Sequence, residues 1–366
     1  MINIKETFLA LTTRRYPKGT EDIAMDLVKG MLPDVKFEKD EFDNYYTYIP
    51  KADGSDSDTM FTSHLDTINS GPYTSYNNGK KWDTELKKYV EDPDAKVDDM
   101  GVVHVMDGDF VKTDGETNLG ADDKAGTTIM MNMISEKVPG LYYFFMGEES
   151  GCVGSSNLSR VFTSKEHPKM NKCISFDRRG YDSIITEQHG VCASDEFANE
   201  LSKRLNEYGF WFKPDPTGVY TDSAEFTDVI PECSNISCGY FSEHTKSEKQ
   251  DLEFLELLGI VATQIDWETL PIVRDKDKIY SGKKSKTYRS YSHWDDDYGY
   301  AYGGSYNSYP SKKKSKSYSS STNTSKTYTD DGDGLKETKP TSTTDFDFDK
   351  WYGEQKTKSW ETTPGS

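Results

Sequence analysis

The sequence predicts an α/β fold in which a mostly parallel, mixed central sheet is flanked by helices on both faces. Two observations predict it. Short apolar runs that suit buried strands alternate along the chain with segments whose apolar residues recur at helical spacing. The helical segments that separate the strands can serve as the crossovers that connect parallel strands. Because ligands gather at the carboxyl ends of strands in such sheets, the polar residues that follow the apolar runs are the first candidates for function.

The first part of the chain predicts a helix-helix-strand-strand-strand order. The expected helices cover 4–11 and 21–32, and the expected strands cover 35–37, 45–49 and 59–63. Thr20 stands where the second helix needs an N-cap. Residues 69–114 are polar and Gly-rich, so we interpret them as an insertion with one small strand near 102–106.

The second part continues the alternation up to about residue 270. We expect helices over 124–135, 153–163, 194–208 and 250–267, and strands over 141–146, 173–176, 183–187 and 234–240. Ser194 is the expected cap of its helix. Together with the insertion, these elements predict a single domain over 1–275 that is large enough to be a catalytic domain.

The last part, residues 276–366, has a different composition. From residue 281 onward Leu335 is the only Ile, Val, Leu or Met, and Ser, Thr, Tyr, Lys, Gly and Asp dominate. Such a segment cannot bury enough apolar surface to offset its ordering entropy, so we expect a disordered tail. Residues 345–352 alternate aromatic with acidic side chains and read as a short docking motif for a protein partner.

Charge and cysteine content exclude several function classes. The whole chain has a net charge of −19; residues 281–366 hold 14 Lys and Arg against 12 Asp and Glu, a balance of +2, so the first 280 residues carry −21. This acidic body argues against nucleic-acid binding and against an anionic membrane surface. Five cysteines are an odd number without metal-motif spacing, which suits reduced thiols. The N-terminus lacks a secretory pattern and no apolar run has membrane-spanning length, so we expect a cytoplasmic protein.

Five groups of polar residues follow strand-like runs or open a helix. Asp122 and Asp123 lie in a Gly-Ala-Asp-Asp-Lys-Ala-Gly run before a helix, where one of them could simply be its cap. The other groups, in chain order, are His64 with Asp66, Glu148 with Glu149, Asp177 and His244. Each group taken alone can be interpreted as surface charge or as a core histidine without a function, but the occurrence of all five together indicates a metal site.

This ordered set resembles the co-catalytic di-zinc exopeptidases, the group that contains peptidase T, zinc aminopeptidases and related amidohydrolases. The resemblance covers roughly 4–270, and residues 120–126 are its most specific part. It implies two Zn²⁺ ions per chain, with Co²⁺ or Mn²⁺ as substitutes. The implied ligands are His64, Asp122 and Asp177 on one ion, and Asp122, Glu149 and His244 on the other.

The same resemblance implies the catalytic roles. Glu148 is the expected general base, Asp66 the partner that orients His64, and the bond between Asp122 and Asp123 is expected to be cis. The interval between Asp177 and His244 is too short for a separate lid domain.

The expected function is a metal-dependent hydrolase, an aminopeptidase that removes N-terminal residues from short peptides with a water activated by two zinc ions. Asp222 and Tyr240 are weaker candidates for substrate binding. For Asp222, the sequence is equally consistent with a role in capping a loop. Two alternatives stay open: an amidohydrolase or deacylase acting on a non-peptide amide, and a non-catalytic scaffold that keeps the fold.

Overall fold

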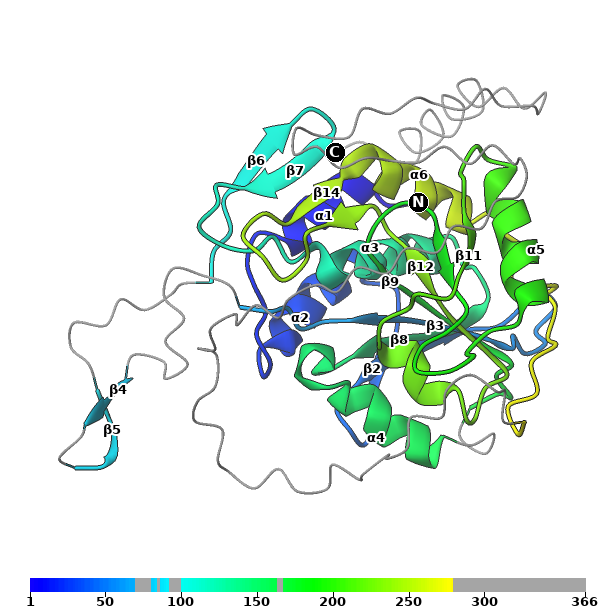
Figure 1. Cartoon of the computed structure of the whole chain (residues 1–366), viewed down its shortest axis with the longest axis horizontal. Coiled ribbons are helices and arrows are strands. Elements are labelled where there is room, and N and C mark those ends of the chain that lie inside the picture. Colours follow the sequence, from blue (N-terminus) through cyan, green and yellow to red (C-terminus); the bar gives the residue numbers. More distant parts are fainter. Residues whose placement is uncertain (70–79, 84–85, 92–99, 163–166, 279–366) are drawn as a thin grey trace, which may run out of the picture. The chain divides into compact units, whose positions relative to one another are not determined.

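The computed structural model describes residues 1–69, 80–83, 86–91, 100–162 and 167–278 (Figure 1). Much of the predicted insertion and nearly all of the predicted tail, with its docking motif at 345–352, lie outside the described residues. The division into 1–275 and 276–366 therefore stays a prediction.

A mixed sheet forms the centre of the described part of the chain. Its eight strands are, in spatial order, β1 (Glu38–Lys39), β2 (Tyr45–Ile49), β8 (Gly140–Phe145), β3 (Thr59–His64), β9 (Lys172–Arg178), β12 (Glu232–Ser237), β10 (Ser183–Ile185) and β11 (Lys213–Asp215). The middle strands β8, β3, β9 and β12 are parallel. Antiparallel pairings attach β2 to β8 and β10 to β12. The predicted α/β class with a mostly parallel central sheet is confirmed.

Helices cover both faces of this sheet (Figure 1). They are α1 (Ile4–Leu11), α2 (Glu21–Met31), α3 (Ala121–Ser135), α4 (Val153–Val161), α5 (Asp195–Asn206) and α6 (Leu252–Ala262), with two short 3₁₀ helices, η1 (Glu148–Ser150) and η2 (Asp222–Phe226). Helix α3 packs on β3 and β9, and α1 and α6 pack on α3. On the other face α4 contacts η2, which contacts β9 and β12.

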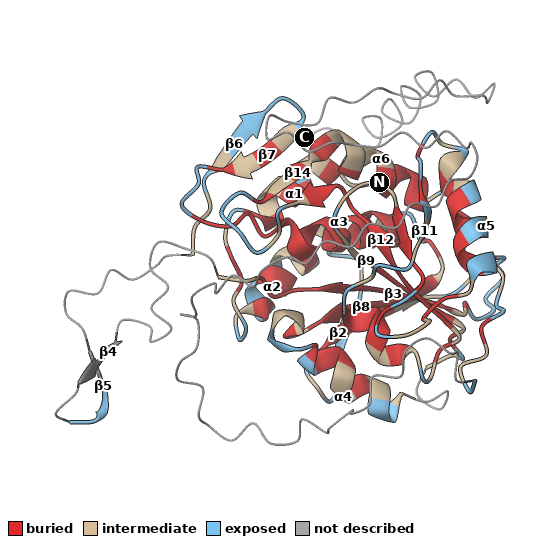
Figure 2. Cartoon of the chain, viewed as in Figure 1, coloured by how far each residue is buried: buried red, intermediate tan, exposed pale blue. Residues whose placement is uncertain are grey.

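The alternation of side chains along the strands divides the core in two. On β8, Tyr142 and Phe144 join the larger apolar cluster, under α1, α2, α3, α5 and α6, whereas Leu141, Tyr143 and Phe145 join the smaller cluster under α4 and η2. All five are fully buried (Figure 2). A strand with both faces covered needs apolar residues at every position, which explains the continuous apolar run in the sequence.

A second sheet lies beside the first and contains the end of the predicted insertion. Its order is β13 (Tyr240–Phe241), β14 (Lys249–Asp251), β7 (Phe110–Thr113) and β6 (His104–Asp107), all antiparallel. A separate hairpin joins β4 (Lys80–Asp83) to β5 (Lys88–Glu91). The loop between β13 and β14 carries His244.

Several predicted boundaries were wrong for identifiable reasons. Residues 35–37 have no regular structure: the Val35 N–H closes a turn by donating to Leu32 O, and only Glu38 and Lys39 pair with β2. Thr20 makes no side-chain cap bond, because its hydroxyl donates to Pro17 O instead.

Two further boundaries differ near the end of the body. The strand expected over 234–240 is interrupted between β12 and β13 by Gly239, whose φ is +82°. The last helix starts later than expected, because 249–251 pair with β7, and it is capped by the Asp251 carboxylate. The cap at Ser194 is confirmed, since its hydroxyl accepts the Phe197 N–H at 3.1 Å.

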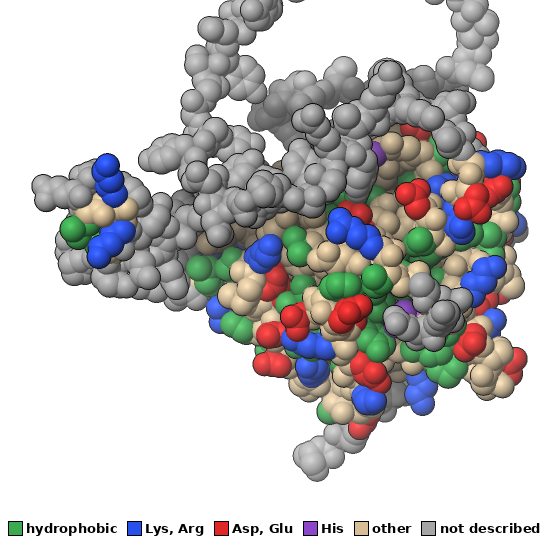
Figure 3. Space-filling model, turned by 90° about the horizontal axis from the view of Figure 1, so that it is seen from below, with side chains coloured by type: hydrophobic (Ala, Val, Ile, Leu, Met, Phe, Trp, Pro, Cys, Tyr) green, Lys and Arg blue, Asp and Glu red, His purple; other side chains and the backbone are tan. Residues whose placement is uncertain are grey.

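The remaining observations concern surface charge, the thiols and the length of the helices. Acidic and basic side chains are interspersed on the face shown in Figure 3. All five cysteines are buried free thiols. Within the described ranges, none of the helices combines the length and the apolar character that crossing a bilayer requires.

Candidate metal centre

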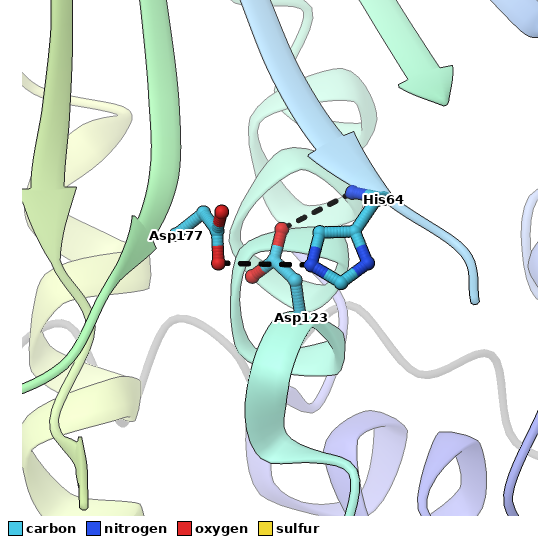
Figure 4. A group of neighbouring side chains, drawn as sticks. All are labelled: His64, Asp123 and Asp177. Atoms are coloured by element: carbon cyan, nitrogen blue, oxygen red, sulfur yellow. Dashed lines mark hydrogen bonds and ion pairs between the residues drawn. The ribbon is translucent and has the colours of Figure 1, made fainter. Parts of the chain in front are cut away.

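The candidate ligands meet at the carboxyl ends of the parallel strands. His64 is the last residue of β3, and Asp177 lies at the end of β9 (Figure 4). The other three come from the start of α3 (Asp122), from η1 after β8 (Glu149) and from the loop between β13 and β14 (His244). Five segments far apart in sequence thus deliver imidazoles and carboxylates to one place, as the sheet geometry predicted.

Asp122 lies between the two histidines. Its Oδ1 is 2.9 Å from His64 Nε2, and its Oδ2 is 3.2 Å from His244 Nε2. Burial by itself raises the pKa of the Asp122 carboxyl, but the two imidazoles outweigh burial and hold that pKa below its usual range. Each oxygen of this carboxylate therefore faces a different histidine, which is the geometry of a group that can bridge two cations.

The remaining carboxylates extend each side of this arrangement. Glu149 Oε2 is 3.1 Å from His244 Nε2, and Asp177 Oδ1 is 3.7 Å from His64 Nε2. Burial lowers the pKa of His64, yet the carboxylates around it raise that pKa well above its usual value. The structure thus brings all five residues together, with Asp122 next to both histidines. The donor atoms that all lie within 4.8 Å of one another form two sets, His64 with Asp122 and Glu149, and His64 with Asp123 and Asp177. Their roles as ligands are a proposal.

Asp123 is a buried carboxylate to which the sequence assigned no ligand role. It lies within 4.8 Å of His64 and Asp177 (Figure 4). Its Oδ2 accepts the His64 N–H at 3.2 Å, and its Oδ1 accepts the Gly126 N–H at 2.9 Å, as a helix cap does. The capping role thus falls on Asp123, and Asp122 is left to face the histidines. The peptide bond between the two is cis, as the resemblance implied.

Asp66 holds two parts of the centre in place. Its two oxygens accept the backbone N–H groups of Glu148, at 3.0 Å, and Glu149, at 3.1 Å. His64 Nδ1 lies 3.0 Å from the Asp66 carbonyl oxygen and 3.4 Å from its carboxylate Oδ1. Burial raises the pKa of Asp66, but His64 and Lys124 pull it below the usual range. Asp66 therefore orients both the imidazole on β3 and the turn that follows β8.

Glu148 reaches the centre from its edge. Its Oε2 is 4.0 Å from His64 Nε2, and its Oε1 accepts the Cys152 thiol at 3.5 Å. Burial raises the pKa of Glu148 well above its usual value, and neighbouring carboxylates add to the effect. A carboxylate with an elevated pKa beside the candidate ligands is suited to accept and return a proton.

Asp222 and Tyr240 are buried next to the candidate centre and contact other protein groups. Asp222 is 1 % exposed, and its Oδ1 accepts the Ser155 hydroxyl at 2.5 Å; burial raises its pKa to about 8. Tyr240 is 2 % exposed and donates its hydroxyl to Asp177 Oδ1 at 3.1 Å, while the Thr221 hydroxyl donates to Asp177 Oδ2. Their contact with a substrate stays a prediction; in the structure Tyr240 and Thr221 hold Asp177.

The cluster contains more negative charge than its own cations balance. Burial raises the pKa of Asp123, Glu149 and Asp177, and Lys124, whose own pKa burial lowers, is the ammonium group beside them. Glu149 Oε1 is buried and makes no hydrogen bond to any described residue. An unpartnered carboxylate oxygen among like charges is costly unless a cation compensates it. Because the grouped donors are nitrogen and oxygen without thiolate, the residues fit Zn²⁺, Mn²⁺ or Co²⁺.

Comparison with known proteins places the fold. No protein-family model matches the chain. An 84-residue stretch is 39 % identical to the uncharacterized protein YqjE of Bacillus subtilis, covering 21 % of this chain and 23 % of that protein. The chain thus matches less than a quarter of this curated relative's length.

Solved structures resemble the chain over a much larger part. The aminopeptidase PepT of Bacillus cereus superimposes with a TM-score of 0.53 at 16 % identity, over 71 % of this chain and 96 % of that one. The TET1 peptidase of Pyrococcus horikoshii gives 0.52 at 16 %, over 71 % and 98 %. A tripeptidase from Staphylococcus aureus gives 0.51 at 14 %, over 71 % and 96 %. At these identities the likeness shows the fold, and it confirms the resemblance to exopeptidases at that level.

Proposed function

We propose that this chain, which shares its fold with solved aminopeptidases, is itself a metal-dependent aminopeptidase that removes N-terminal residues from short peptides. The position of Asp122 carries the proposal. Its two oxygens face His64 and His244 from opposite sides, and Asp177 and Glu149 extend the two sides. A structural acidic turn has no need of two imidazoles in contact with one carboxylate.

The proposed centre holds two zinc ions. His64, Asp122 and Asp177 would bind one ion, and Asp122, Glu149 and His244 the other. When bound, two such cations polarise the carbonyl of the scissile bond and make a water molecule more acidic. The unpartnered Glu149 Oε1 and the surplus of buried carboxylates support this assignment.

Glu148 is the proposed general base. It takes a proton from the attacking water and returns it to the departing amine, because its carboxylate lies beside the ligands without contacting either histidine within hydrogen-bond distance. Asp66 fixes the backbone of Glu148 and the ring of His64, so it acts as a positioning residue. Tyr240 and Thr221 hold Asp177 in the same sense.

The proposed substrates have a free N-terminal amine. Such an amine can bind a metal ion or a neighbouring carboxylate, whereas an acylated amine cannot. A cytoplasmic location belongs to the same proposal and is supported by the five free thiols. A protein partner for residues 345–352 remains a proposal from sequence alone.

The decisive experiment measures metal content and substrate class together. Purified protein is analysed for zinc, and it is assayed on aminoacyl-nitroanilides and on their N-acetylated analogues before and after chelation. About two zinc ions per chain with chelator-sensitive cleavage of free-amine substrates alone is the expected result. Cleavage of the blocked analogues at similar rates would favour the amidohydrolase, and protein without metal would favour the scaffold.

A matched pair of variants assigns the metal to this centre. Asp122→Asn removes charge from the shared carboxylate and should lower both the zinc content and the rate. Glu207→Gln removes one charge from an exposed position after α5 and should change neither. Full zinc content and full rate in the Asp122→Asn protein would refute the proposal.

A further inference from the structure

We propose that Glu248 is the positioning residue that fixes Asp122 and His244 relative to each other, and thereby sets the affinity of the metal position that His244 shares with Glu149. This inference rests on the proposed function. It is carried by the hydrogen bonds of Glu248, which connect two segments of the centre that are more than 100 residues apart in sequence.

The turn that leads to Asp122 is buried but has no regular structure of its own. Residues 117–121 are all buried, and they precede the helical part of α3. Buried backbone N–H groups need acceptors, because water cannot reach them. The Glu248 carboxylate supplies these acceptors: Oε2 accepts the N–H of Leu119 and of Gly120, each at 2.8 Å, and Oε1 accepts the N–H of Asp122 at 3.0 Å.

The same residue anchors the loop that carries His244. Residues 242–248 join β13 to β14, and His244 keeps 46 % of its side chain exposed. The loop folds on itself through Thr245, whose hydroxyl donates to Ser242 O at 2.7 Å and accepts the Ser247 N–H at 3.1 Å. Glu248 ends the loop and is fully buried. It is therefore the point at which this exposed loop is fastened to the interior.

The two functions meet in one side chain. Glu248 comes four residues after His244 and binds the backbone of Asp122, and His244 Nε2 lies 3.2 Å from Asp122 Oδ2. The loop with one ligand and the turn with the other are thus held by the same carboxylate. A change in that carboxylate moves Asp122, His244 or both, and it acts most strongly where the two ligands must meet the same cation.

Replacement by glutamine tests the arrangement without removing its volume. All three groups facing Glu248 are donors, so the site accepts an acceptor-only side chain. In Glu248→Gln one oxygen becomes an NH₂ donor, which faces at least one N–H and leaves it without an acceptor. If the glutamine oxygen takes the place of Oε2, the amide of Asp122 loses its partner.

Glu232 offers a matched control. It is also a fully buried glutamate, and its carboxylate acts only as an acceptor. The donors are the N–H and the hydroxyl of Ser194 and the N–H groups of Val273 and Arg274. It lies at the start of β12, and it contacts none of the candidate ligands among the described residues. Glu232→Gln therefore reproduces the destabilisation that results from placing an amide NH₂ among buried hydrogen-bond donors, and it leaves the proposed metal centre unchanged.

The experiment is a zinc titration of the full, chelator-stripped chain against a fluorescent competitor, with denaturant unfolding as a check of folding. The wild type should bind zinc in two steps. In Glu248→Gln one step should weaken by about 10- to 100-fold, the range found for partners of metal ligands, and more than the other step. Glu232→Gln should keep both steps even where its unfolding midpoint falls.

His244→Ala identifies the affected step. The step lost in His244→Ala should be the one that weakens in Glu248→Gln, and adding Glu248→Gln to His244→Ala should change the remaining step less than tenfold. Should Glu248→Gln fail to fold, Glu248→Asp carries the same test, because it keeps the charge and shortens the reach.

The outcomes separate this inference from the proposed function. Two unchanged steps in folded Glu248→Gln, or equal weakening of both, would overturn the role of Glu248 and leave the metal centre intact. A wild-type chain that binds no zinc would overturn the proposed function, and the inference with it.

Discussion

A methyl group at position 126 should disrupt the centre without touching any candidate ligand directly. Gly126 lies in α3, and its N–H donates to Asp123. A Cβ at this position would lie 2.2 Å from the carbonyl oxygen of Phe176 and 2.6 Å from Asp123 Oδ1. Ordinary contact begins near 3.4 Å, so α3 and β9 would have to separate by more than 1 Å.

The magnitude follows from what lies on each side of this contact. Phe176 precedes Asp177, and Asp123 follows Asp122, so the separation moves apart two residues that we propose as ligands of one cation. We expect Gly126→Ala to cost about 1–3 kcal/mol in the free energy of unfolding, as overpacking does. A misplacement of 1 Å costs on the order of 100-fold in rate, so kcat/KM should fall by about that factor.

Gly30 provides the control. It lies inside α2, and a Cβ there would meet nothing within 4 Å. Gly30→Ala should therefore stabilise the fold by about 0.5–1 kcal/mol and leave hydrolysis unchanged. Denaturant unfolding and hydrolysis of aminoacyl-nitroanilides measure both effects. A Gly126→Ala protein with wild-type rate and wild-type unfolding midpoint would refute the close approach of α3 and β9.

Four further outcomes are expected. Glu148→Gln should keep its zinc and lose about 10²- to 10⁴-fold in kcat, because only the proton transfer is removed; unchanged turnover at full zinc content would exclude Glu148 as the base. Chelation from a zinc concentration 100 times the Kd should lower the free energy of unfolding by about 2.7 kcal/mol, seen as a lower Tm, and an unaltered Tm would argue against binding to the folded state. In the metal-free chain Asp122 and Glu149 raise the pKa of His244 to about 11, so a proton must leave before its nitrogen binds zinc. The apparent zinc affinity should therefore fall with falling pH, by up to about tenfold per pH unit for each proton displaced, and calorimetry in buffers of different ionisation heat should detect proton release; binding without release would contradict the raised pKa. Arg274 donates to four backbone carbonyls, those of Val191, Thr227, Ile230 and Pro231, so Arg274→Ala should cost about 3 kcal/mol in denaturant unfolding while the zinc content of the folded protein stays that of the wild type.

Local patterns were sufficient for most of the fold. The run at 141–146 predicted a buried strand, and β8 occupies nearly the same residues. The apolar spacing at 4–11 predicted α1 with its bounds. Errors occurred where pairing with a distant segment overrode the local pattern. The helix was predicted from residue 250, yet the backbone of 249–251 pairs with β7. The sequence of the insertion that contains β7 gave no indication of that pairing.

The candidate centre divides in a similar way. The five proposed ligand positions followed from the resemblance, because they lie in short motifs. Which of Asp122 and Asp123 faces the histidines depends on backbone direction at the start of α3, which composition does not encode. Glu248 appeared in the sequence only as an acid shortly after His244. Its bonds to Leu119 and Asp122 cross more than 100 residues and became visible only in the fold.

The direction of β3 also offers a place to modify the protein. His64 ends the strand at the metal centre, whereas the exposed turn between β2 and β3, closed by the Gly54 N–H to Lys51 O, lies toward its other end. Thr59 and His64 are about 17 Å apart along an extended strand. Gly54 has a φ of +82°, so a side chain at that position would be strained, whereas its exposed neighbour Ala52 already carries a Cβ. A fluorophore, an affinity tag or new chain termini introduced at this turn would therefore lie at a distance that leaves the proposed metal centre undisturbed.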